Sequence, residues 1–348
     1  MAAQDAVAPT GREPAAILYS PSWVDHLTHG IARLAGPAWG GYLLLLVGLV
    51  ILINALNWIG GRYPAPTLDP LQSAYAVYAV YMLALIQHLN GVAGSAIASF
   101  RPALEVNASE YQRIRSELTS LPAREGALAG LAGLAFVGIM YVADLPDAST
   151  LHPAVLIGTL AVEAFTIAVF AVLIYHTVHQ LRLVSRIHAL ASRIDLFDPP
   201  TLHAFSTLTA RTGIGLVLLL TYSYLIDPSI DPVGAAMTGV VVVVAAAAFV
   251  LPLEGMHRRI VVEKERLQRE ADRRLQATFA ELHRSVDEHD LSLSDGLNKT
   301  LLSLQSERET LARIAAWPWQ PGTLRAVVTA LVVPIVLWLI FRALDRFV

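Results

Sequence analysis

The chain has 348 residues, of which 55% are hydrophobic and only 15% are charged, whereas about 25% of the residues of an average soluble domain are charged. Its mean hydropathy is +0.54. Long uncharged segments account for the missing charge, and roughly 20 apolar residues are enough for a helix to cross a bilayer. The composition excludes an average soluble domain. It predicts an all-α, multi-pass membrane protein whose first partner is the lipid bilayer.

Scarce residue types exclude several kinds of chemistry. The absence of cysteine excludes disulfides, thiolate nucleophiles and iron–sulfur clusters. Lysine occurs only at Lys264 and Lys299, which both lie in a polar segment, so no lysine is placed for a Schiff base inside the membrane. The formal net charge of −3 argues against a nucleic-acid partner. Residues 1–37 lack the pattern of a cleavable signal peptide, and we expect none.

Seven segments have the length and apolarity of a transmembrane helix. They cover residues 39–59, 73–90, 126–143, 154–175, 212–226, 233–253 and 326–341. Trp39 and Trp58 flank the first segment, and Trp317 and Trp319 precede the last. Indole rings prefer the membrane interface, so these positions agree with the proposed ends. The sequence therefore predicts about seven spans, with six and eight as the alternatives.

Basic residues indicate the orientation of the spans. They concentrate in alternate loops, at 101–125, 177–211 and 254–322. The intervening loops 144–153 and 227–232 contain none. Because cytoplasmic loops carry the excess of arginine and lysine, the pattern predicts a cytoplasmic N-terminus in a bacterial or archaeal cell membrane. Arg342 and Arg346 then lie on the opposite side, which is the weak point of the seven-span count.

Segment 254–322 has the pattern of two helices that project from the membrane. From Met256 to about Val286, apolar residues recur at helical spacing between charged ones, which continues the sixth span as an amphipathic helix. Leu297, Leu304 and Leu311 then recur every seven residues. The two patterns together predict a cytoplasmic antiparallel coiled-coil hairpin. Acidic and basic residues are nearly balanced in it, so it presents no surface of a single charge.

The chain therefore divides into four predicted parts. They are an N-terminal cytoplasmic segment (1–37), a six-span bundle with cytoplasmic helical extensions (38–253), the hairpin (254–322) and a final span (323–348). In the first part, Trp23, Leu27, Ile31 and Leu34 form an apolar stripe at helical spacing. The stripe predicts a short helix that lies either on the membrane surface or against the protein's own helices.

Two further signals concern how the helices end and pack. The fourth span continues with helical periodicity into polar sequence until Asp198-Pro199-Pro200, where proline favours a stop. Thr201 is then expected to be the N-cap of the next helix. In the third span, Gly126 and Gly130 are followed by Gly133 and Gly138, and small residues of this kind allow close approach between membrane helices.

Glu163 is the one acidic residue deep inside a predicted span. A carboxylate in hydrocarbon is costly unless it is protonated, paired or faces a polar cavity. It indicates either a proton- or cation-linked site or a single interhelical hydrogen bond. Gln87, His88 and Asn90 cluster near the inner end of the second span. They are candidates for the same polar pathway, with His88 as a partner for Glu163, or for ordinary interhelical hydrogen bonds.

Other motifs give no reason to predict catalysis. His176 and His179 lie one turn apart at the end of the fourth span, but zinc wants at least a third ligand, and helix capping is the simpler interpretation. We therefore predict no metal and no cofactor. Nucleotide-binding loops, serine-hydrolase motifs and metalloprotease motifs are absent from the sequence, so we expect that the protein is not an enzyme.

Two hypotheses of function follow. The first is a homo-oligomeric channel or transporter for ions or small solutes, with Glu163 in its pathway and the hairpin for assembly or gating. The second is a non-transporting membrane sensor or scaffold that binds a cytoplasmic protein partner through 254–322. Loss of flux in Glu163→Gln favours the first, and loss of a partner on deletion of 262–312 favours the second.

Overall fold

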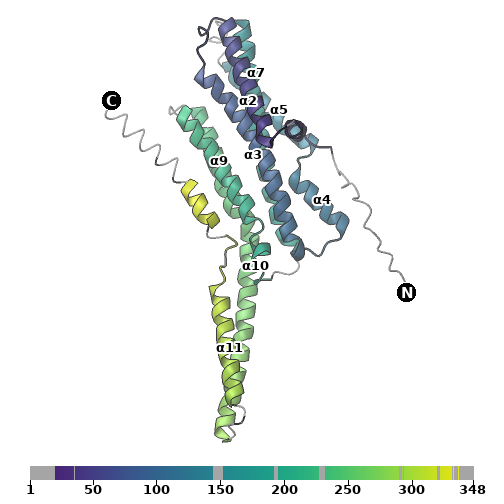
Figure 1. The fold of residues 1–348 in the computed structure, drawn as a ribbon, viewed down its shortest axis with the longest axis vertical. Coiled ribbons are helices and arrows are strands. Elements are labelled where there is room, and N and C mark those ends of the chain that lie inside the picture. The colour runs from purple at the N-terminus through teal and green to yellow at the C-terminus, as the bar shows by residue number, and fades with distance from the viewer. Residues whose placement is uncertain are drawn as a thin grey trace, which may run out of the picture.

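The computed structural model describes residues 20–34, 36–143, 152–191, 195–226, 232–289, 292, 294–319, 322–330, 332 and 336. These residues form helices and no β-strand, which confirms the all-α prediction (Figure 1). The α-helices are α1 (Trp23–Ala32), α2 (Ala38–Ile59), α3 (Pro70–Phe100), α4 (Ala108–Thr119), α5 (Ala123–Ala143), α7 (Pro153–Leu190), α8 (Pro199–Leu202), α9 (Ser206–Ile226), α10 (Pro232–Asp287) and α11 (Ser294–Arg313), with a 3₁₀ turn at Arg101–Ala103.

Six helices of the described chain are long and apolar enough to cross a membrane. They are Trp39–Ile59, Pro70–Ala103, Ala123–Val142, Pro153–Leu190, Pro199–Ser223 and Thr238–Asp287. The first six predicted spans fall within α2, α3, α5, α7, α9 and α10. Much of the seventh, 326–341, lies outside the described residues, so the count of seven stays a prediction.

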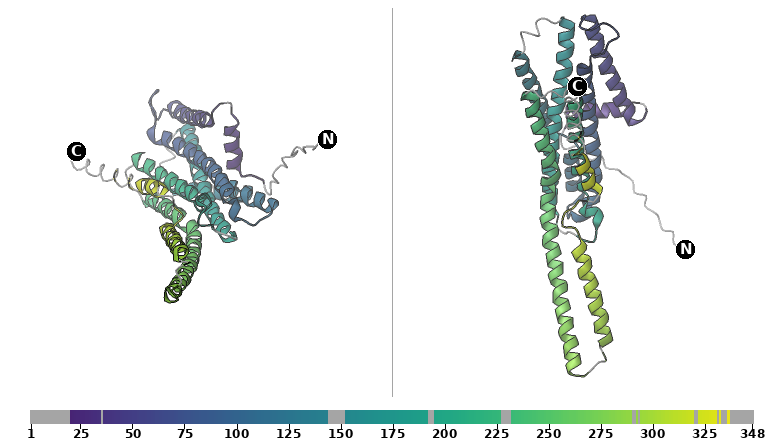
Figure 2. Two further views of the ribbon diagram at one scale, coloured as in Figure 1. Left: turned by 60° about the horizontal axis from the view of Figure 1, so that its bottom comes forward. Right: turned by 90° about the vertical axis from the view of Figure 1, so that its left-hand side faces the viewer.

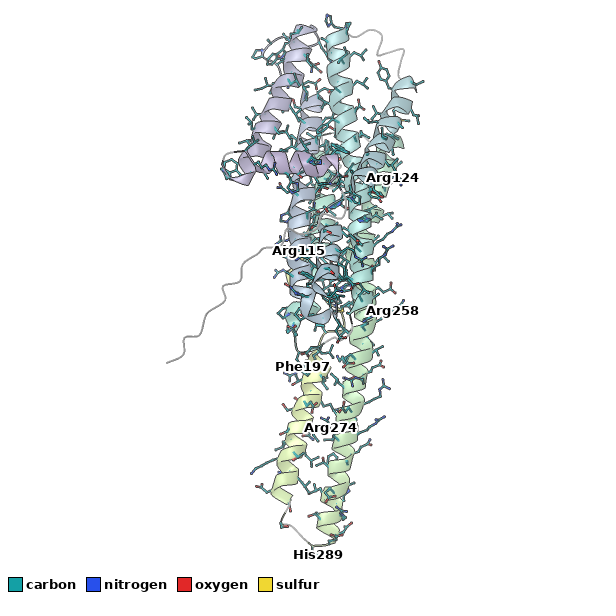
Figure 3. All side chains as sticks on the ribbon, turned by 90° about the vertical axis from the view of Figure 1, so that its right-hand side faces the viewer. Arg115, Arg124, Phe197, Arg258, Arg274 and His289 are labelled. Carbon is teal, nitrogen blue, oxygen red and sulfur yellow. The ribbon has the colours of Figure 1, made fainter. Side chains whose placement is uncertain are left out.

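The long helices run side by side along the long axis of the molecule, and the three arginine-rich segments lie toward the same end (Figures 1 and 2). Arg115, Arg258 and Arg274 follow one another toward that end in Figure 3. This arrangement agrees with the alternation of basic and bare loops in the sequence. Which side of the membrane this end faces stays a prediction.

The most tightly packed core lies in the basic half of the molecule. Phe100, Leu118, Ile187 and Phe205 are at most 2% exposed there. On α2, by contrast, Leu44 is 65% exposed, as lipid-facing side chains of a spanning helix are. Helices α3 and α7 are longer than the predicted spans 73–90 and 154–175, and their extensions contribute to this core.

The predicted junction between the fourth and fifth spans is wrong in detail. Helix α7 ends at Leu190, before the Asp198-Pro199-Pro200 stop. The prolines instead begin the short helix α8, with Asp198 at its N-cap, because proline is well suited to the first helical turn. Thr201 therefore lies inside α8, where its hydroxyl donates a 2.5 Å hydrogen bond to Asp198 Oδ2.

The N-terminal stripe forms α1, which crosses the bundle at about the height of Arg124 (Figure 3). Its start is a capping box, in which Asp25 N donates to Ser22 Oγ and Ser22 N donates to Asp25 Oδ2. The apolar face of α1 buries Val24 and Ile31 against the protein. Of the predicted stripe, Trp23 and Leu27 also pack partly buried against the core, whereas Leu34 is exposed, and a position of α1 at the membrane surface stays a prediction.

Helices α10 and α11 form a two-helix hairpin that extends beyond the rest of the molecule (Figures 1 and 2). Arg308 Nε lies 3.2 Å from Asp272 Oδ1, which fixes the pairing of the two helices. Lys264 Nζ donates to Ala312 O at 2.9 Å and to Ile314 O at 2.7 Å. It thereby satisfies carbonyl groups at the end of α11. The coiled-coil character of this hairpin stays a prediction.

Candidate functional site

The three polar residues predicted near the inner end of the second span point to three different neighbours. Gln87 Oε1 accepts a 2.5 Å hydrogen bond from Tyr42 of α2. His88 Nε2 lies 3.2 Å from Arg211 Nη1 of α9. Asn90 Oδ1 lies 2.8 Å from His176 Nε2 of α7. Each residue thus joins α3 to a different helix, which is the interhelical alternative, and they do not gather at one site.

Glu163 lies half-buried on α7, at a different depth. The hydrogen bond between Asn90 and His176 puts these two residues at one level of the bundle. Glu163 and His176 are both on α7, so at about 1.5 Å per residue Glu163 lies about 20 Å from that level along the helix axis. Between the two levels, α7 packs Val169, Val172 and Leu173, each 0% exposed, against its neighbours. The structure therefore separates Glu163 from the other three candidates, and the proposed contact between Glu163 and His88 is not made.

A buried polar layer surrounds His176. On α7, His176, Thr177 and Gln180 are at most 1% exposed, and Gln180 Nε2 donates to Leu118 O at 3.0 Å. Within the described chain, His176 Nδ1, Thr177 Oγ1, His179 Nε2 and Gln180 Oε1 are buried without a protein hydrogen-bond partner. Ordered water commonly satisfies such atoms. The sequence singled out the two histidines but gave no signal for the rest of this layer.

The described residues contain no group of three histidine, aspartate or glutamate side chains that could hold a metal ion. The ring of His179 stacks on Tyr175 at a centroid distance of 6.0 Å. The polar layer therefore joins three helices, α7 to α3 through Asn90 and α7 to α4 through Leu118 O.

An aromatic stack fastens the segment between the hairpin and the last predicted span. Phe249, Trp319, Trp317 and His257 stack in series, with ring centroids 4.8, 4.4 and 4.0 Å apart. His257 Nδ1 lies 2.9 Å from Ala316 O, and His203 Nδ1 lies 2.8 Å from Pro318 O. The tryptophans predicted as interfacial markers thus pack on α10, at the base of the hairpin.

A groove of about 540 Å³, with both apolar and polar walls, opens beside this base, between α3, α8 and the start of α9. Its walls include Ser95 and Ser99 of α3, His203, and Thr207 and Arg211 of α9. The sequence placed Arg211 in a basic segment and on the helix expected to begin at Thr201, and in the structure it lies on α9, which begins at Ser206.

Comparisons with protein families, with characterised proteins and with solved structures found no match to this chain. The function must therefore be inferred from the arrangement of the chain itself.

Proposed function

We propose that the chain is a non-transporting membrane scaffold or sensor, which presents the α10–α11 hairpin to a cytoplasmic protein partner. The observation that carries the proposal is the continuity of α10. This helix runs for 56 residues without a break, from an apolar spanning half to the charged arm of the hairpin. At about 1.5 Å per residue it is roughly 84 Å long. Pro252 lies inside it, where the charged arm follows the apolar half, and the helix continues through this proline to join the two regions.

Polar contacts at the base of the hairpin attach it firmly to the membrane-spanning helices, which supports the proposal. Arg259 Nη2 donates to Ala189 O at 2.9 Å, and Arg259 Nη1 donates to Ala191 O. His188, 2% exposed, has Nδ1 2.9 Å from Pro252 O of α10. Because α10 is thus attached to the end of α7, a movement of the spans would be passed to the hairpin.

The surface of the hairpin is suited to water and to polar partners. Acidic and basic residues pair along each helix, as in Glu254–Arg258, Glu270–Arg274 and Asp295–Lys299. Exposed pairs of this kind contribute at most about 1 kcal/mol each, but they keep both helices solvated. A partner would therefore recognise a pattern of charged side chains rather than a continuous apolar surface.

Deletion of the hairpin tests this role. Replacing residues 262–312 with a linker of about four Gly and Ser residues bridges the two helix ends, since an extended chain spans about 3.3–3.6 Å per residue. We expect the shortened protein to insert and to purify as a folded protein, but to lose the partner that photo-crosslinks to the intact hairpin. The control keeps the hairpin and deletes residues 1–19. Equal crosslinking of a partner without the hairpin would contradict the proposal.

A transporter is the second candidate, because Glu163 places a half-buried carboxylate inside a spanning helix. Proton and potassium flux into proteoliposomes distinguishes the two. The scaffold or sensor predicts that the wild-type chain gives no flux above protein-free vesicles. Flux that disappears in Glu163→Gln, but persists in the exposed-surface control Glu110→Gln, would establish transport instead. Homo-oligomerisation belongs to this second candidate, and light scattering of the purified protein tests it.

A further inference from the structure

Arg211 is the one arginine, lysine or acidic residue in the lining of the groove between α3, α8 and α9. Arg211 Nη1 lies 3.2 Å from His88 Nε2, and no ion pair joins Arg211 to a carboxylate within the described chain. Guanidinium has no acceptor, so His88 Nε2 accepts this hydrogen bond and its ring is neutral. One full positive charge therefore stands at the mouth of the groove.

The rest of the groove offers the contacts that a small anion requires. The hydroxyl-bearing residues Ser95, Ser99 and Thr207 line it together with the guanidinium of Arg211. Hydroxyl groups and a guanidinium are the donors that bind phosphate oxygens, and an arginine can bind two of them at once. Val92 and Ala204 supply apolar walls, which fit the glycerol and first methylene groups next to a phosphate.

The position of Arg211 on α9 favours a groove at the membrane boundary. Most of α9 is buried, and its more exposed side follows Thr207, Arg211, Ile214 and Leu218 at intervals of three and four residues. Leu218 is 50% exposed and lies two turns into the apolar part of this span. An arginine at the end of a lipid-facing stripe lies at the level of the headgroups.

We propose that this groove is a binding site for a phosphate group, held by Arg211 and the hydroxyl groups of Ser99 and Thr207, with Ser95, whose hydroxyl donates to Gly91 O, on its wall. The group is presented by an anionic lipid headgroup or by a soluble phosphate. The lipid-facing stripe favours the headgroup. The site does not depend on the proposed scaffold or sensor function, because its argument uses only the cavity, its charge and its depth.

The site also touches the base of the hairpin. His203 lines the groove, and its Nδ1 lies 2.8 Å from Pro318 O, between the stacked rings of Trp317 and Trp319. A phosphate bound against this wall stands next to the segment that joins the hairpin to the last predicted span. If the chain is a sensor, this contact gives the ligand a direct route to the hairpin.

Binding is measured on the full-length purified chain in detergent with three probes. Native mass spectrometry counts retained phosphatidylglycerol against phosphatidylcholine, and calorimetry measures binding of inorganic phosphate. We expect selective retention of phosphatidylglycerol, weakened about tenfold or more in Arg211→Gln through loss of a charge-assisted contact. Ser95→Trp, which fills the groove at an exposed helix position and keeps the charge, should weaken binding equally. Arg182→Gln, at an exposed arginine on α7, should bind like the wild type.

The lipid and phosphate measurements distinguish the two sources of the phosphate group. Phosphatidylglycerol binding lost in both groove variants identifies a lipid headgroup, and phosphate binding lost in both identifies a soluble ligand. If the circular dichroism spectrum shows that Arg211→Gln does not fold, Ser95→Trp alone tests whether the ligand binds in the groove. The proposal is overturned if the wild type binds neither anionic probe, or if the groove variants bind as well as Arg182→Gln.

Discussion

Replacing Asp25 with alanine is expected to lower the free energy of unfolding by about 4 kcal/mol, because it leaves several buried donors without an acceptor. The carboxylate is 1% exposed. Its Oδ2 accepts from Ser22 N at 3.2 Å, from Ser22 Oγ at 2.9 Å and from Leu121 N at 3.0 Å. The last bond joins α1 to the loop before α5, so its loss should release α1 from the bundle.

Thiol labelling can follow this release, because the chain has no cysteine of its own. Val24 is 1% exposed, and a cysteine introduced there should react with a maleimide only when α1 detaches. We expect rapid labelling of Val24→Cys in the Asp25→Ala background and slow labelling in the parent. His26→Ala changes an exposed residue of the same helix and should label slowly. Slow labelling in Asp25→Ala as well would show that Asp25 does not hold α1 in place.

Features with a local pattern were predictable from the sequence. Uncharged segments located the first six spans, because each spanning helix must present apolar side chains to lipid or to a neighbour. The period of Leu297, Leu304 and Leu311 predicted the second arm of the hairpin, and Leu301 and Leu311 are buried in it. The stripe from Trp23 to Ile31 likewise predicted α1. In each case the signal lies within one helix.

The polar sites depend on how helices are rotated and paired, which no local pattern records. Gln87, His88 and Asn90 are neighbours in sequence, yet successive helical residues point about 100° apart, and each meets a different helix. Asp25 and Leu121 are 96 positions apart. The ends of α3 and α7 lie beyond the predicted spans, but they are buried against one another in the core of the basic half.

Several independent contacts lie at the base of the hairpin. Arg259 and His188 join α10 to the end of α7, and His203 joins the start of α9 to Pro318. The spans and the hairpin are therefore joined by a set of polar contacts at one level, next to the groove. A ligand that binds in the groove would lie next to contacts of both ends of the hairpin, which is the arrangement expected of the proposed sensor.

Gly133→Ala is expected to lower the free energy of unfolding by about 2 kcal/mol, in the range for overpacking a tight contact. A Cβ at this position would lie 2.8 Å from Ile167 O and 3.0 Å from Ala168 Cα of α7. Both are backbone atoms, so α5 and α7 would have to move apart. Denaturant unfolding of the purified protein in detergent measures the change.

Gly138 supplies the matched control on the same helix, since a Cβ there has nothing within 4 Å. Gly138→Ala should raise stability by about 0.5–1 kcal/mol, because alanine is the better helix former. The two substitutions are chemically identical and should differ in sign. If both raise stability, α5 and α7 do not meet as closely as these distances require. If both lower it, the loss arises from something other than the contact with Ile167 and Ala168.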